Sequence, residues 1–185
     1  MQIIDLIAAN EKAIEQTAQL LFESFEDHAP EAWPTIDAAL EEVHESLGEE
    51  RISRVAIDDD GSVIGWVGGS KEYDGKVWEL HPLAVAATHR RQGIGRALVA
   101  DLEAQARARG GITIMLGTDD EDNRTTLGGV DLYPAVWQHI NAIKNLNNHP
   151  YEFYCKLGFV IVGVIPDANG LGKPDIFMAK RIAKK

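Results

Sequence analysis

The chain begins with two stretches in which apolar residues recur at the spacing of a helix. Residues about 10–27 form the first stretch, with apolar side chains at Ile14, Ala18, Leu21 and Phe25. Thr35 has a side chain suited to capping a helix, and it precedes a second apolar series at Ile36, Leu40, Val43 and Leu47. We therefore predict two amphipathic helices, separated by Pro30 and Pro34 and closed at Gly48.

The following segment is rich in β-branched residues and predicts strands. Residues 52–57 and 63–67 flank the turn Asp58–Gly61, which predicts a hairpin. Residues 77–85 predict another strand, and Pro82 interrupts it. A proline inside a strand marks an edge or a bulge, so we expect some local amides to be left out of the ladder.

A helix, a strand and a long polar segment come next. Leu98, Leu102 and Ala106 predict the helix, which stops at Gly110, and residues 112–116 predict a buried strand. Residues 117–147 are expected to be irregular, and loops of that length often carry function. A short helix over 150–157 and strands over 159–165 and 175–182 complete the pattern. Because there is no repeat, low-complexity segment or linker, we predict a single domain over residues 1–185.

The charge of the chain is strongly acidic and unevenly distributed. The 185 residues carry a net charge of −11, and residues 1–50 contain 13 of the 29 acidic residues but only one basic residue, Lys12. A basic surface for nucleic acid is therefore not expected. The acidic first part either attracts a cationic ligand or serves solubility alone.

Other features favour a cytoplasmic protein without a membrane partner. No apolar run approaches the ~18 residues of a membrane span, and no basic segment followed by an apolar block indicates a signal peptide. Cys155 is the only cysteine, so no internal disulfide is possible and a reducing compartment fits. We expect Cys155 to be a packing residue rather than a nucleophile. No spacing of His, Cys and carboxylates suggests a metal site.

A glycine-containing turn lies before the third helix. Gly93 and Gly95 allow close approach to the backbone, and a helix start offers unpaired N–H groups and a positive dipole end, which together bind anions. A plain turn is the alternative, and the two common nucleotide-binding glycine patterns are absent. Basic residues favour the anion site because they stand out in an acidic chain: His89, Arg90, Arg91 and Arg96.

The segment Arg90-Arg91-Gln92-Gly93-Ile94-Gly95 matches the motif Arg/Gln-x-x-Gly-x-Gly/Ala, and with the order of elements it resembles the GCN5-related N-acetyltransferase (GNAT) family. The resemblance implies an α/β (α+β) fold. Its mixed, mostly antiparallel twisted sheet has about seven strands, about four flanking helices, and splayed fourth and fifth strands. It also implies acetyl-coenzyme A as the cosubstrate, bound by Leu83, Val85, Arg90, Arg91, Gln92, Gly93, Ile94, Gly95, Arg96 and Tyr154.

The second half of the chain is similar, more narrowly, to aminoglycoside 6′-N-acetyltransferases. The first 75 residues match mainly at Trp33-Pro34. The similarity is carried by Trp78–Leu83, Arg109–Ile114, Leu116–Asp120, His149–Tyr154, Lys156–Phe159 and Lys173–Ile176.

Acetyl transfer to an amine needs a proton acceptor and a donor to the thioester oxygen. The resemblance implies direct attack in a ternary complex, with Glu79 as the base or as a group that holds the substrate ammonium; a solvated strand residue is the alternative. His81, on the same strand face, relays a proton or is structural. Pro82 has no N–H, so the Leu83 amide is expected to polarise the acetyl carbonyl.

The remaining candidates lie mostly late in the chain. Tyr154 matches the family's tyrosine near the coenzyme sulfur and is the expected acid, with packing as the alternative; Tyr151 shares its helix face. The acidic residues of the segment 119–122 are read as a rim for substrate ammonium groups or as a solvated loop. The residues expected to bind substrate are Trp33, Glu79, Asp119, Asp120, Tyr151 and Asp175.

Three functions are compatible with these residues. The first is acetylation of the 6′-amine of aminoglycosides, polycations that suit an acidic protein, which confers antibiotic resistance. The second is acetylation of another amine, such as a polyamine, a protein lysine or an N-terminus. The third is an acyl-coenzyme A-binding module without catalysis. The resemblance also implies a homodimer, and the helical spacing of Trp137, Ile140 and Ile143 fits internal packing or a partner surface.

Overall fold

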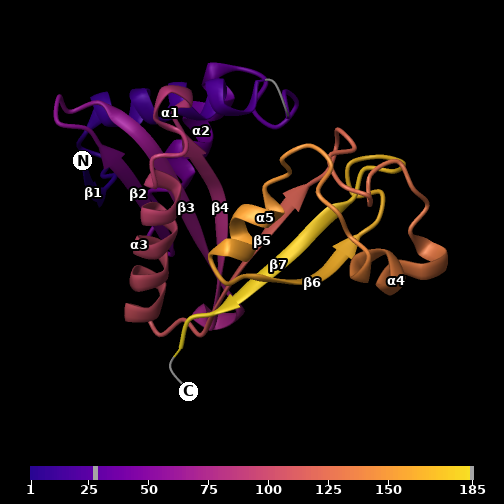
Figure 1. Cartoon of the computed structure of the whole chain (residues 1–185). Coiled ribbons are helices and arrows are strands. Elements are labelled where there is room, and N and C mark those ends of the chain that lie inside the picture. Colours follow the sequence, from indigo (N-terminus) through magenta and orange to yellow (C-terminus); the bar gives the residue numbers. More distant parts are fainter. Residues whose placement is uncertain (27–28, 184–185) are drawn as a thin grey trace. The chain divides into compact units, whose positions relative to one another are not determined.

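Seven strands and five α-helices make up the part of the chain that the computed structural model describes, residues 1–26 and 29–183. The strands follow the order β1-β2-β3-β4-β5-β7-β6. Two compact units divide the chain: unit 1 contains Met1–Ile114 and the residues from Ile182, and unit 2 contains Met115–Arg181 (Figure 1). The mixed sheet of about seven strands is thus confirmed, and the splay of β4 from β5 stays a prediction.

Four antiparallel strands form the sheet of unit 1: β1 (Gln2–Asp5), β2 (Arg51–Ile57), β3 (Val63–Glu72) and β4 (Val77–Val85). The hairpin of β2 and β3 turns at Asp58–Gly61, as the sequence predicted. β1 was not predicted, because four residues are too few for a periodic signal.

Helices cover both faces of this sheet (Figure 1). Trp66 of β3 packs in a buried cluster with α1 (Glu11–Phe25) and α2 (Ile36–Glu45). The neighbouring Gly65 lies instead against Leu98 of α3 (Ile94–Ala108), and successive strand residues point to opposite faces. The predicted Thr35 cap of α2 is confirmed, because its side chain accepts a hydrogen bond from the Ala38 amide at 3.2 Å.

Unit 2 contains most of β5 (Thr113–Asp119), together with β6 (Val160–Ile165) and β7 (Asp175–Arg181), which pair antiparallel. Its helices are α4 (Val136–Asn141) and α5 (Tyr151–Lys156). The segment expected to be irregular therefore contains a helix, α4, whose six residues are too short for a helical pattern to predict. This helix makes five where the resemblance implied about four.

Candidate functional site

β4 is interrupted where the sequence predicted. Val67 of β3 is in register with Leu83 and Gly69 with Leu80, so two residues of β4, His81 and Pro82, lie opposite Gly68 alone. A side chain at Gly68 would collide with the His81 carbonyl, which explains the glycine there. The bulge expected at Pro82 is thus confirmed, and the His81–Pro82 peptide is cis.

The bulged strand presents the predicted residues on one face. Burial alternates along β4, and the even-numbered residues from Trp78 to Ala84 are buried. The odd-numbered residues form the less buried face, which includes Glu79, His81, Leu83 and Val85. The Ser70 hydroxyl of β3 donates a long hydrogen bond of 3.4 Å to Glu79 Oε2. We refer to Glu79, His81, Leu83 and Val85 as the β4 face.

An aromatic group from the segment between α1 and α2 lies beside the β4 face. The Trp33 indole is 5.7 Å from the His81 imidazole, measured between ring centroids, and their planes are tilted by 34°. Phe25 at the end of α1 packs edge-on with Trp33, with their ring centroids 4.8 Å apart. Trp33, which the sequence analysis lists among the residues expected to bind substrate, therefore lies next to His81.

The predicted anion-binding turn leads directly into α3. Gly93 has φ 87° and ψ −2°, a left-handed conformation that favours glycine, and no side chain of the described residues caps the helix start. The Ala97 amide donates to the Gly93 carbonyl at 3.0 Å, so the amides of residues 94–96 precede the first helical hydrogen bond. A side chain at Gly93 would meet no atom within 4 Å, so the turn is open on this side.

Two side chains of the motif help to build the turn. Arg90 Nε donates to the Val85 carbonyl at 3.1 Å, and Gln92 Nε2 donates to the Thr88 carbonyl at 3.2 Å. Arg91 and Arg96 are exposed. The structure thus joins the predicted turn to Val85 of β4, with uncapped backbone amides and exposed guanidinium groups at one helix start.

Tyr154 is the central predicted residue in unit 2. Its ring packs edge-on against Phe153 and Phe159, with centroid distances of 5.0 and 5.7 Å. Burial raises the pKa of the Tyr154 phenol far above its ordinary value, so the phenol is protonated at neutral pH. Tyr151, also buried, has a pKa that burial raises in the same direction. Both tyrosines are therefore hydrogen-bond donors rather than phenolates.

The acidic rim after β5 needs correction. Asp120 is fully buried: Oδ1 accepts from the Arg124 amide at 2.6 Å, and Oδ2 accepts from the Thr125 amide and hydroxyl at 2.9 and 2.7 Å. The expectation that Asp120 lies on an exposed rim is wrong, because these bonds fold the loop around it. Asp119 is exposed, and its carboxylate accepts from Asn169 Nδ2. Glu121 pairs with Lys173 at 3.4 Å.

Two further residues complete the predictions for unit 2. Asp175 begins β7, is half-buried, and its carboxylate lies against Gly117 of β5. Cys155 is exposed, so the prediction that it packs in the core is wrong; the short α5 turns it outward. Its thiol is nevertheless partly shielded from water, and this shielding and the nearby Glu152 raise the pKa of the Cys155 thiol. The thiol therefore stays protonated, which disfavours nucleophilic attack.

Sequence reasoning missed one residue that the structure makes prominent. His149 is 2% exposed and connects the end of β5 with the start of α5 through its ring nitrogens. The residue stands in a matched segment, directly before a proline and a short helix. A histidine at such a helix start was the available signal, but the sequence does not reveal that it is buried.

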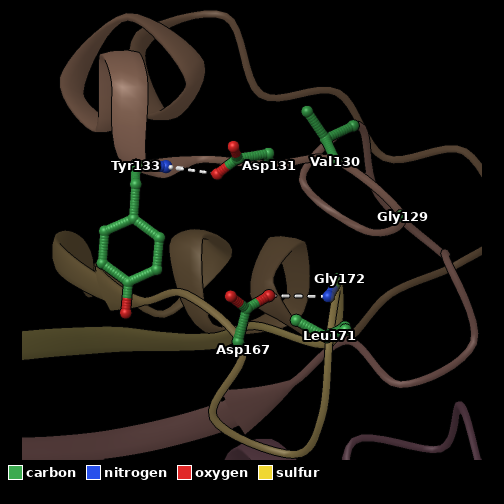
Figure 2. Close-up of a pocket in the computed structure, with 7 residues that line it drawn as sticks. All are labelled: Gly129, Val130, Asp131, Tyr133, Asp167, Leu171 and Gly172. Carbon is green, nitrogen blue, oxygen red and sulfur yellow. Dashed lines mark hydrogen bonds between the residues drawn. The ribbon is translucent and has the colours of Figure 1, made fainter.

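An open pocket of about 540 Å³ lies elsewhere in unit 2 (Figure 2). Figure 2 shows the Tyr133 side chain directed toward the segment that carries Asp167. The Asp167 carboxylate accepts a hydrogen bond from the Gly172 amide. None of the residues that line the pocket belongs to the predicted site: Gly129, Val130, Asp131, Tyr133, Asp167, Leu171 and Gly172.

In the described ranges, no group of three His, Cys, Asp or Glu residues is arranged to hold a metal ion. Within the same residues, no helix has the length and apolar character needed to cross a membrane.

Comparisons with known proteins identify a matching family and similar solved structures. The model of the acetyltransferase (GNAT) family matches residues 14–128. An aminoglycoside 6′-N-acetyltransferase complexed with coenzyme A is 42% identical, with a TM-score of 0.91, and one from Enterococcus faecium is 43% identical, with a TM-score of 0.90. An aminoglycoside 6′-acetyltransferase type Ii is 38% identical, with a TM-score of 0.76. Each alignment covers 100% of this chain and 99% of the other. No curated protein sequence matched at the same level of significance.

Proposed function

Because the chain belongs to the acetyltransferase (GNAT) family, we propose that it transfers the acetyl group of acetyl-coenzyme A to the 6′-amine of aminoglycosides. The observation that carries this proposal is similarity over the full chain, at 42–43% identity, to two aminoglycoside 6′-N-acetyltransferases. The bulged β4 face and the uncapped start of α3 supply the local chemistry.

The coenzyme pyrophosphate fits the turn before α3. Uncapped amides and the positive end of the helix dipole favour an anion there, and the exposed Arg91 and Arg96 add charge. Gly93 leaves room for a close approach of phosphate oxygens. Leu83 and Val85, on the β4 face, are assigned to the part of the coenzyme that carries the thioester, with the Leu83 amide donating to the acetyl oxygen.

The reaction is a direct attack of the amine on the thioester carbonyl. Glu79 accepts one proton from the substrate ammonium, directly or through water, and this proton passes to solvent. The amine nitrogen then forms the C–N bond, the C–S bond breaks, and the nitrogen loses a second proton as the amide forms. The departing sulfur gains one proton, so the products are the acetylated amine and the free thiol of coenzyme A. His81 is the candidate for relaying protons along the β4 face.

Tyr154 is the donor assigned to the departing sulfur. Because burial keeps the phenol protonated, its O–H is available to stabilise negative charge as the C–S bond breaks. Burial also disfavours the phenolate, so the hydrogen bond is the larger contribution. The second proton that the nitrogen loses balances the one that the sulfur gains, so the phenol ends the step protonated. Tyr154→Phe removes the donor but keeps the ring contacts with Phe153 and Phe159.

An aminoglycoside is a polycation, and acidic groups are assigned to its other ammonium groups. Asp119 and Asp175 are the carboxylates of unit 2 that we retain for this role, while Tyr151 and Trp33 provide ring surfaces. Asp120 is excluded from direct contact because its oxygens are bonded within the loop. The acidic residues of the first 50 positions add a long-range attraction.

We also propose that units 1 and 2 form one catalytic domain, since the matched family segment, residues 14–128, crosses the division between them.

A cytoplasmic homodimer that confers aminoglycoside resistance is proposed as well. The edge strand β6 exposes Val160, Val162 and Ile165, which favours a partner on unit 2. Sedimentation equilibrium tests this assembly, and a monomer at micromolar concentration contradicts it.

The reaction is tested by release of free coenzyme A from acetyl-coenzyme A. Purified protein is assayed with an aminoglycoside that has a 6′-amine and with a close analogue that has a 6′-hydroxyl. We expect turnover with the amine alone. Equal turnover assigns the acetylation to another position, and no turnover with either compound contradicts the aminoglycoside proposal. A panel of polyamines, peptides and protein N-termini then tests acetylation of other amines, and coenzyme binding without any turnover indicates a non-catalytic module.

A further inference from the structure

His149 lies between two backbone groups that fix its protonation state. Nε2 is 2.9 Å from the Asp119 carbonyl oxygen, and Nδ1 is 3.2 Å from the Tyr151 amide nitrogen. A carbonyl only accepts and an amide only donates, so the proton is on Nε2 and Nδ1 accepts. The two contacts therefore require one neutral tautomer of the ring.

The main chain around this ring is fixed independently. Asn145 Oδ1 accepts from the His149 amide at 2.8 Å, and Asn145 Nδ2 donates to the His149 carbonyl at 2.9 Å. Arg124 donates to the carbonyls of Asn147 and Asn148. Because these bonds use the backbone of His149, a substitution of its side chain removes the ring contacts and leaves the segment anchored.

The ring contact with Tyr151 falls at the first residue of α5. This helix has only six residues, and the Pro150 carbonyl accepts from the amides of Phe153 and Tyr154. A helix so short is marginal by itself, so its orientation depends on contacts such as the one at Tyr151. Tyr154 lies one turn further along, and a shift of the helix start is carried to its phenol.

We propose that His149 is a positioning residue, whose neutral ring fixes the start of α5 against the end of β5 and thereby orients the Tyr154 phenol for the departing sulfur. The proposal rests on the function proposed above for Tyr154. It assigns a role in the reaction to a residue that does not itself contact the reacting atoms. A displacement of about 1 Å at a reacting group lowers turnover on the order of 100-fold, so the effect is measurable.

The required tautomer makes this contact sensitive to acid. The groups around His149 are Asp119 and Asp120 at the end of β5, Arg124 in the following loop, and Tyr151 of α5. Burial, the largest effect, lowers the pKa of His149, and the Arg124 charge acts in the same direction. The hydrogen bond to the Asp119 carbonyl and the charges of Asp120 and Asp119 oppose this shift only in part. Protonation would place a second N–H against the Tyr151 amide, where an acceptor is needed, and would release the helix start.

Three substitutions separate the two ring contacts. His149→Asn keeps an acceptor near the position of Nδ1, His149→Gln keeps a donor near Nε2, and His149→Phe keeps neither. We expect His149→Phe to lower kcat by roughly 10- to 100-fold, with the KM for acetyl-coenzyme A within about twofold of wild type. His149→Asn should retain kcat within about fivefold, while His149→Gln should resemble His149→Phe. We expect kcat of wild type to decline at acidic pH, and this decline should be smaller in His149→Asn.

A purely structural role would lower the melting temperature of all three variants and leave kcat of the folded fraction unchanged, and that result overturns the proposal. Equal kcat in the Asn and Phe variants also overturns it, because the acceptor for Tyr151 would then not matter. If His149→Phe does not fold, the Asn and Gln variants still provide the comparison.

A measurement without substrate separates this proposal from the proposed function. Hydrogen exchange of the Tyr151 amide, followed by NMR, should be faster in His149→Phe than in wild type and near wild type in His149→Asn. Tyr154→Phe should lower turnover without changing this exchange. Unchanged exchange in His149→Phe overturns the positioning role whatever the turnover. Absence of aminoglycoside turnover in wild type, with the exchange as expected, overturns the proposed function and supports the contact at Tyr151.

Discussion

At the start of α3, no side chain of the described residues caps the backbone amides, whereas after β5 polar side chains are buried and bonded to the backbone. The first region has open space at Gly93 and exposed Arg91. In the second, Asp120 accepts three hydrogen bonds and His149 uses both ring nitrogens. Polar groups without an intramolecular partner at a helix start serve binding, whereas buried polar groups that are hydrogen-bonded to the backbone stabilise the conformation of a loop. Charge alone does not distinguish these two uses.

The largest effect is expected on the β4 face, where a polar group is assigned to chemistry. Glu79→Gln removes the proton acceptor but keeps the size of the side chain. We expect kcat/KM to fall by about 100- to 10,000-fold. Coenzyme A release at saturating acetyl-coenzyme A measures this, and the melting temperature serves as the control. A loss smaller than about tenfold contradicts the assignment of Glu79 as the base.

The hydrogen bonds that the buried Asp120 accepts are tested by comparing it with its neighbour Asp119. Asp120→Asn places an amide N–H₂ against donors that the carboxylate now accepts from, so we expect a loss of about 1–3 kcal/mol in the free energy of unfolding. Asp119→Asn is the matched control, because Asp119 is exposed and should change stability by less than about 0.5 kcal/mol. Urea denaturation measures both. Equal losses would show that burial does not separate the two carboxylates.

The open turn is tested by a pair of glycines with the same backbone conformation. Gly93 and Gly61 have φ of 87° and 84°, and a side chain at either position meets no atom within 4 Å. Alanine at each position should cost about 1–2 kcal/mol of stability. Only Gly93→Ala should weaken acetyl-coenzyme A, by about tenfold in Kd, since Gly61 lies in the β2–β3 turn. Titration calorimetry measures the affinity, and equal Kd values would place the coenzyme elsewhere.

The smallest effect is the pH dependence of stability that His149 contributes. Its folded pKa is lowered by burial, so between that value and the ordinary value of about 6.5 the unfolded chain binds more protons than the folded chain. The contribution is fully present above about pH 6.5 and is lost as the pH falls, by at most about 1.4 kcal/mol per pH unit. Urea denaturation of wild type and His149→Asn between pH 5 and 8 measures the difference. A parallel decline in both proteins assigns it to other groups.

The β4 bulge and the α3 turn were predictable because each depends on residues that permit few alternatives. Pro82 cannot join a regular ladder, and Gly93 adopts a conformation that other residues avoid. Asp120 and His149 were not predictable in the same way. Whether a carboxylate in an acidic run is exposed or buried depends on residues that fold over it later in the chain, such as Thr125. Cys155 shows the converse, since a lone cysteine predicts a packing residue but α5 leaves it exposed.

The start of α3 has a consequence for inhibitor design. Amide groups are present in every residue except proline, so substitutions of exposed side chains such as Arg96 leave those of the α3 start unchanged. A compound anchored on these amides would meet a surface that few point mutations remodel. A mutation that prevents binding of such a compound would have to introduce a proline or change the backbone conformation. Either change would also damage the site for the natural cosubstrate.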